Sequence, residues 1–190
     1  MANVGEVLGG LDPLFRDRFL ELLDRCRTAG FRVVPYDGAR SPWQQAIYWR
    51  QSRTRTEVLR QIEQLRNDGA EYIAQIMEEV GPHSGRHVTD AIPGKSFHQY
   101  RRAVDSYIES PDTRRALWRE RAKDEAEYDL AVDLYERLGE IAESLELTWG
   151  GRWSIGDFGH VQQQLASSPL EEFGSWLALD AALKEAWPHP

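Results

Sequence analysis

The sequence predicts an α+β domain in which helices flank a small and mostly antiparallel sheet. Amphipathic helical patterns take up most of the chain, and only a few short runs rich in β-branched and aromatic residues separate them. No internal repeat or low-complexity segment is visible. With 190 residues, of which 41% are hydrophobic, the chain can bury a core without staples, and we expect a single domain over residues 1–190.

The helices are predicted from start signals and from apolar spacing. Asp12 before Pro13 is typical of an N-cap with proline at the first helical position, and apolar residues follow at helical spacing as far as Cys26. Ser41 before Pro42 predicts a second helix start. Further helical patterns cover two segments of residues 56–80, residues 111–118, residues 130–145 and residues 173–187.

The strands are predicted from short runs with alternating side chains. In residues 103–108, Ala103, Asp105 and Tyr107 share one face, and the residues between them share the other. The remaining strand predictions cover residues 31–36, 86–89, 145–149 and 160–165.

Composition excludes several kinds of partner. The chain has 31 acidic and 23 basic residues, and its net charge of −8 disfavours a nucleic-acid backbone, which requires a basic surface. Cys26 is the only cysteine, so neither a disulfide framework nor a cysteine-based zinc site is expected. No apolar stretch is long enough to span a membrane. The first ten residues have no basic n-region or long apolar h-region, so we expect no Sec signal peptide.

His98 and Asp105 form the first candidate for a metal site. They stand seven positions apart, and a single strand cannot point both side chains to one face because an odd offset reverses the face. If the chain bends within residues 99–102, His98 can face Asp105. An imidazole and a carboxylate are a usual pair in catalytic zinc sites, which take three protein ligands and leave a position for water.

A third ligand must then come from a distant part of the sequence. The stretch 149–162 offers His160, with Asp157 three residues before it. Taken alone, Asp157 between two glycines is typical of an Asx turn, and His98 is typical of a structural histidine. The functional reading therefore depends on the two stretches together.

Together these stretches spell S-x-H-x-x-x-x-A-x-D and W-G-G-x-W followed by D-x-x-H-V-Q. This pattern resembles the zinc D-Ala-D-Ala carboxypeptidase and L-alanyl-D-glutamate endopeptidase family, whose members cut bacterial cell-wall peptides and include many phage endolysins. The fold expected from the resemblance is that of these peptidases and of hedgehog-type domains. The likeness extends back to residues 38–42 and 88–94, so it touches most of residues 31–164.

The resemblance implies a role for each site residue. His98, Asp105 and His160 would bind Zn²⁺, and Asp157 would be the catalytic acid and base. Arg40 would bind the substrate or stabilise the tetrahedral oxyanion, since its planar fork suits carboxylates. A surface arginine at a helix N-terminus is the alternative for Arg40.

Two more residues have open roles. Ser96 would bind substrate or orient the site, although capping a turn is an equal alternative. Trp149 and Trp153 could stack on sugar or peptide, and core packing is the alternative for at least one of them. The resemblance makes Trp153 a candidate for substrate binding.

The chain departs from the family pattern in three places. Relatives usually have glycine at the position of Arg101 and often proline at that of Gly159, so the loop between the ligands is expected to differ. Relatives also pass more directly from the helix at Ser41 to the segment at Val88. We therefore interpret residues 54–82 as a helical insertion, either scaffold or a flap that selects substrates.

The predicted function is a zinc-dependent peptidoglycan peptidase that hydrolyses an amide bond of the stem peptide. The vancomycin-resistance dipeptidase pattern Glu-Trp-Trp-His is absent, which favours an L-alanyl-D-glutamate endopeptidase. The alternatives are a D-Ala-D-Ala carboxypeptidase or dipeptidase, and a zinc-stabilised binding module without catalysis. Without a signal peptide, we expect synthesis in the cytoplasm and action on the wall after phage lysis or specialised secretion. An antibacterial effector would also have an immunity or delivery protein as partner.

Overall fold

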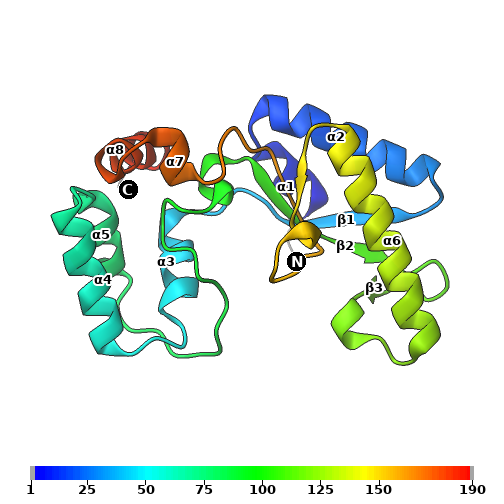
Figure 1. The fold of residues 1–190 in the computed structure, drawn as a ribbon, viewed down its shortest axis with the longest axis horizontal. Helices are drawn as coiled ribbons and strands as arrows, with labels where there is room; N and C mark the ends of the chain where they lie inside the picture. The colour runs from blue at the N-terminus through cyan, green and yellow to red at the C-terminus, as the bar shows by residue number, and fades with distance from the viewer. Residues whose placement is uncertain (1–2, 189–190) are drawn as a thin grey trace. The chain divides into compact units, whose positions relative to one another are not determined.

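The computed structural model describes residues 3–188, which fold into two compact units. The first unit comprises Met1–Ala39 and Arg101–Gln164, and the second comprises Arg40–Tyr100 and Leu165–Pro190 (Figure 1). No described helix is long and apolar enough to cross a membrane.

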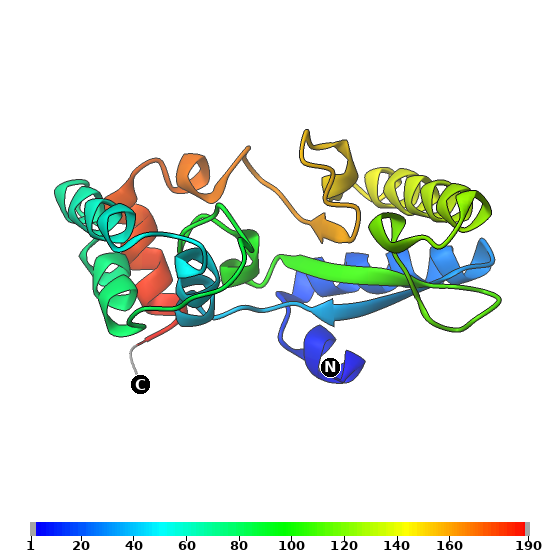
Figure 2. The same cartoon turned by 90° about the horizontal axis from the view of Figure 1, so that it is seen from below.

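The first unit holds a five-stranded sheet in which every pairing is antiparallel. The strand order is β1-β2-β5-β4, and β3 pairs with the C-terminal end of β2. Figure 2 shows the blue β1 beside the green β2. The predicted α+β fold, with a small antiparallel sheet and flanking helices, is confirmed. The strands are β1 (Arg32–Asp37), β2 (Ala103–Glu109), β3 (Ala116–Leu117), β4 (Thr148–Trp149) and β5 (His160–Gln162), and the helices are α1 (Val4–Gly9), α2 (Pro13–Thr28) and α6 (Glu125–Ser144).

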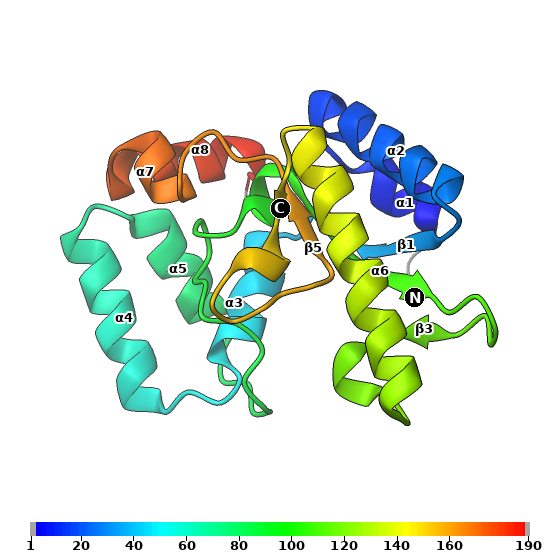
Figure 3. The ribbon, with the colours of Figure 1, turned by 45° about the vertical axis from the view of Figure 1, so that its right-hand side comes forward.

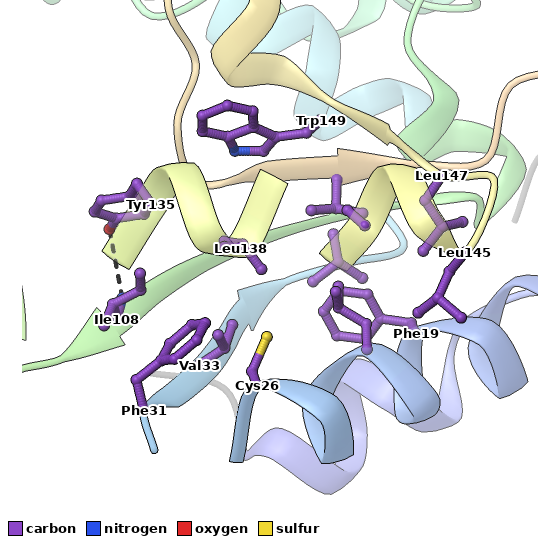
Figure 4. Close-up of a cluster of buried hydrophobic side chains, with 14 of the residues drawn as sticks. Phe19, Cys26, Phe31, Val33, Ile108, Tyr135, Leu138, Leu145, Leu147 and Trp149 are labelled. Atoms are coloured by element: carbon purple, nitrogen blue, oxygen red, sulfur yellow. Dashed lines mark hydrogen bonds between the residues drawn. The ribbon is translucent and has the colours of Figure 1, made fainter. Parts of the chain in front are cut away.

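The first core lies on one face of this sheet. Val104 and Ile108 of β2 point to that face, and they are fully buried in one cluster with side chains of α2 and α6 (Figure 4). Because side chains alternate along a strand, Asp105 and Tyr107 point to the opposite face. The helices therefore cover one face of β2, and the candidate site lies on the other.

The start of α2 follows the predicted cap. The carboxylate of Asp12 accepts hydrogen bonds from the backbone N–H groups of Leu14 and Phe15, both at 3.1 Å, and Pro13 occupies the first turn. These bonds satisfy donors that a helix N-terminus otherwise leaves without partners.

The second unit is built of helices around its own core. Figure 3 shows α4 and α5 side by side, and their side chains, such as Leu65 and Met77, are buried together with Leu179 of α8. Residues 54–82 thus supply much of this core, which favours scaffold over a flap for that segment. The elements are α3 (Pro42–Arg50), α4 (Arg55–Asn67), α5 (Glu71–Glu79), the 3-10 helix η1 (Phe97–Tyr100), α7 (Pro169–Phe173) and α8 (Trp176–Ala186).

Two local predictions are wrong, and the short helix α7 was not predicted. Residues 86–89 form no strand, and residues 111–118, where a helix was predicted, form turns and β3, followed by the 3-10 helix η2 (Arg119–Arg121). The reason for the second is non-local, since Leu117 pairs with Ile108 across the sheet. The helix predicted over 173–187 forms as α8, and the short helix α7 before it ends at Gly174, whose φ of 75° is left-handed.

Candidate metal centre

Asp105 and His160 face each other across the β2–β5 ladder. They are direct partners in the antiparallel register, so their side chains project to the same face of the sheet. The Nδ1 of His160 lies 2.9 Å from the Oδ1 of Asp105. His160 is 6% exposed, and Asp105 is half-buried.

This contact requires a proton or a metal ion between the two atoms. A ring nitrogen without a proton and a carboxylate oxygen are both acceptors, so they approach closely only around a proton or a metal ion. Burial lowers the pKa of His160, but the hydrogen bond to Asp105 and the charge of that carboxylate outweigh burial and raise the pKa above its usual range. The pair is therefore suited to hold a cation.

His98 is positioned by η1. Its ring is almost fully buried, its N–H donates to Ser96 Oγ at 3.4 Å, and its carbonyl accepts from the N–H of Arg40 at 3.1 Å. After η1 the chain turns at Arg101, whose φ is 61°, and enters β2. The predicted bend between His98 and Asp105 is confirmed, and Arg101 adopts the left-handed conformation that suits the glycine of relatives.

The three predicted ligands come together in the described part of the chain. One donor atom from each of His98, Asp105 and His160 lies within 4.8 Å of the other two. Two imidazoles and one carboxylate form a donor set that zinc accepts, and three ligands leave a fourth position open. These residues could therefore hold a metal ion.

Asp157 lies on a turn with a fixed backbone. The carbonyl of Gly150, in the 3-10 helix η3 (Gly150–Arg152), accepts from the N–H of Asp157 at 3.0 Å and from that of Trp153 at 3.1 Å. A Cβ at Gly150 would lie 2.5 Å from the Asp157 carbonyl oxygen, so only glycine fits there. The backbone carbonyl of Asp157 also accepts a hydrogen bond from the N–H of His160 at 3.3 Å, which links the turn to β5. Asp157 itself is exposed.

The two tryptophans of the motif have different surroundings. Trp149 is 1% exposed, lies in the first core, and donates from Nε1 to the Phe158 carbonyl at 2.8 Å. Trp153 is half-buried, with its ring 5.0 Å from that of His160. Core packing therefore accounts for Trp149, and Trp153 stands beside a predicted ligand.

Gly159, where relatives often have proline, makes a close backbone contact. Its carbonyl accepts from the N–H of Ser106 at 2.8 Å, and a Cβ at this position would lie 2.4 Å from the Ser106 carbonyl oxygen. In this chain the position therefore requires glycine.

In the second unit, Arg40 is held by a buried amide network. Its Nη1 donates to Oε1 of Gln45 at 3.0 Å, and the same oxygen accepts from Nε2 of Gln99 at 3.2 Å. Gln45 donates in turn to the Ala91 carbonyl at 2.7 Å, and Gln99 accepts from the N–H of Ser96 at 3.3 Å. Both glutamines are fully buried, so they fix the surroundings of two predicted substrate-binding residues.

Sequence reasoning missed these glutamines and two further residues of the first unit. Gln162 contacts the ring of His160, and strand alternation two residues after the histidine is the signal that could have found it. Tyr36 is the other: burial, followed by the charges of Asp105 and Asp157, raises the pKa of its phenol.

The His-Asp-His group lies in a segment that is similar to a peptidase family. A family model described as D-alanyl-D-alanine carboxypeptidase matches residues 90–163, the stretch that carries His98, Asp105, Asp157 and His160. The family resemblance is confirmed over that stretch.

Solved structures with a similar fold include two vancomycin-resistance enzymes. One is a mutant of the D,D-pentapeptidase VanY of a VanB-type cassette in complex with Zn(II), at 17% identity and a TM-score of 0.44, covering 91% of this chain and 83% of that chain. The other is VanYB in complex with D-alanine-D-alanine, at 17% identity and a TM-score of 0.43, covering 93% of this chain and 76% of that chain. The curated proteins give no match.

Proposed function

We propose that the protein is a zinc-dependent peptidoglycan peptidase that cleaves the stem peptide between L-alanine and D-glutamate. The observation that carries the proposal is the grouping of His98, Asp105 and His160 within a segment that matches the peptidase family. The Asp157 turn directly before His160 supports an enzyme over a binding module, because a purely structural site has no use for such a carboxylate.

In this proposal His98, Asp105 and His160 hold Zn²⁺. Bound zinc polarises the scissile carbonyl and lowers the pKa of a water towards neutrality. Asp157 takes a proton from the attacking water and later gives it to the nitrogen of the leaving amine. Its backbone is fixed at Gly150 and at His160, so the carboxylate is carried by a rigid turn.

Substrate binding falls to Arg40, Ser96 and Trp153. A stem peptide carries carboxylates near the scissile amide, and a guanidinium can bind one of them in a bidentate manner. Gln45 supports this role because it fixes one side of the Arg40 guanidinium. Trp153 offers an aromatic face next to His160.

The second candidate is a D-Ala-D-Ala carboxypeptidase, which the description of the matching family favours. The two candidates differ in the bond that is cut and share the same metal site. For either one, we propose action on the cell wall after phage lysis or specialised secretion, and an effector would have an immunity or delivery partner.

The test combines metal content with product analysis. After desalting, the wild type should retain one zinc, His98→Ala and His160→Ala should lose it, and Asp157→Ala should keep zinc but lose turnover. Asp112 is an exposed aspartate outside the site, and the control variant Asp112→Ala should retain both zinc and turnover. An Asp157→Ala protein without metal would make that residue a ligand and the assignment wrong.

Mass spectrometry of purified muropeptides identifies the bond. The proposal expects products with a new N-terminal D-glutamate and no free D-alanine. Release of free D-alanine with the L-alanine–D-glutamate bond intact would establish the carboxypeptidase instead. Neither product from a zinc-loaded protein would support the binding module.

A further inference from the structure

Gln162 is a buried polar residue that lies beside His160 on the same face of β5. It is 5% exposed, and its Oε1 lies 2.9 Å from Nε2 of the His160 ring. Its partner across the ladder is Ala103, whose methyl side chain leaves room for a long side chain at this point. His160 therefore has a partner at each ring nitrogen, Asp105 at Nδ1 and Gln162 at Nε2.

The direction of the Gln162 amide decides which ring nitrogen carries a proton. An amide oxygen only accepts, so Nε2 must donate to it and must be protonated. If the amide were reversed, its NH₂ group would donate to Nε2, and the proton of a neutral ring would sit on Nδ1. That tautomer has no lone pair at Nδ1 for a metal ion.

Gln164 supports the first direction of the amide. The Nε2 of Gln162 donates to Oε1 of Gln164 at 2.9 Å, so the NH₂ group is occupied away from the ring. The hydrogen bonds thus run from His160 to Gln162 and from Gln162 to Gln164, along one side of β5.

We infer that Gln162 is a positioning residue for the metal: its oxygen holds the His160 proton on Nε2, so that Nδ1 can give its lone pair to a metal ion that Asp105 also binds. This inference rests on the zinc site proposed above. Histidines that bind metals generally donate their second N–H to such an acceptor, and losing the acceptor weakens metal affinity. A purely structural Gln162 would support the strand without affecting the choice of nitrogen.

The experiment compares three variants of the full chain by competition for zinc with a chromophoric chelator. Gln162→Met has a similar size but no strong acceptor, and it should weaken zinc binding by about 10- to 100-fold. Gln162→Glu keeps an acceptor and should bind zinc to within a few-fold of the wild type. Gln163→Met, one position along and directly after the end of β5, is the matched control and should have no effect.

A second measurement reads the tautomer directly. Long-range ¹H–¹⁵N spectra of the zinc-loaded protein should show the His160 proton on Nε2 in the wild type, protected from exchange with solvent by the hydrogen bond to Gln162. Gln162→Met should lose that protection, while Gln162→Glu should keep it. Thermal denaturation of each variant establishes that it is folded.

Each outcome distinguishes the inference from the proposed function. If folded Gln162→Met binds zinc like the wild type while His160→Ala does not, Gln162 is only structural and the zinc site stands. If Gln162→Met and Gln163→Met weaken binding equally, the effect belongs to the strand and the inference is overturned. If the wild type retains no zinc, the proposed function and the inference fail together.

Discussion

Trp149 is packed between two glycines, and this arrangement makes Gly139 a sharp test of the structure. A Cβ built at Gly139, in the middle of α6, would lie 2.2 Å from the Trp149 ring, and one at Gly151 would lie 2.1 Å from it. The ring is 1% exposed and holds the Phe158 carbonyl through Nε1. Gly139→Ala should therefore displace the Trp149 ring, whose hydrogen bond to Phe158 supports the turn that carries Asp157.

Two effects oppose each other in Gly139→Ala. Alanine is favoured over glycine within a helix by about 1 kcal/mol. Overpacking a rigid core costs about 1–3 kcal/mol, and a displaced ring loses its hydrogen bond to Phe158 at a further cost of about 1 kcal/mol. Packing outweighs propensity, so we expect the free energy of unfolding to fall by roughly 1–3 kcal/mol.

Urea denaturation followed by circular dichroism measures this change. Gly9→Ala is the matched control, because no atom lies within 4 Å of a Cβ there, and its effect should stay within about 0.5 kcal/mol. In a Trp149→Leu background, Gly139→Ala should become neutral or stabilising, since the obstacle is gone. If Gly139→Ala stabilises the otherwise unchanged protein by about 1 kcal/mol, the ring does not rest on Gly139 and the reasoning is refuted.

Two further predictions concern single side chains. Arg101→Gly should stabilise the protein by about 1 kcal/mol in urea denaturation. The left-handed φ of 61° costs arginine about 1–2 kcal/mol, while glycine loses about 0.5–1 kcal/mol more conformational entropy on folding. A loss of stability would instead assign a favourable contact to the arginine side chain. Asp180 accepts the N–H groups of Ile73 at 2.8 Å and Tyr72 at 3.1 Å, and burial raises its pKa. The folded state therefore holds the Asp180 proton more tightly than the unfolded state does. The stability of the wild type relative to Asp180→Asn should fall as the pH rises from about 4 through the raised pKa. A stability difference that stays constant with pH would contradict this prediction.

Structural features that depend only on residues close together in the sequence could be predicted. The Asp12 and Ser41 caps, the faces of β2 and the bend after His98 all follow from local rules on capping and alternation. The grouping of His98, Asp105 and His160 required more, since it joins distant stretches, and there the family motif supplied the missing information. Residues that contact each other without such a motif were not predicted.

The missed elements depend on partners far away in the chain. β3 is only two residues long, and it becomes a strand because it pairs with β2. Gln45 and Gln99 carry ordinary polar side chains, and their role as a buried support arises only where α3 meets η1 within the second unit. A pattern in one segment contains no information on such a pairing.

Glycine illustrates the same limit from the opposite side. Within a helical pattern Gly139 is a weak point, and beside Asp157 the glycines are typical of a turn. In the structure, Gly139, Gly150 and Gly159 are instead places of closest contact, each with an atom closer than a side chain would permit. Their missing Cβ atoms let a tryptophan ring and two backbone segments approach, and the turn before His160 is rigid because its glycines are packed.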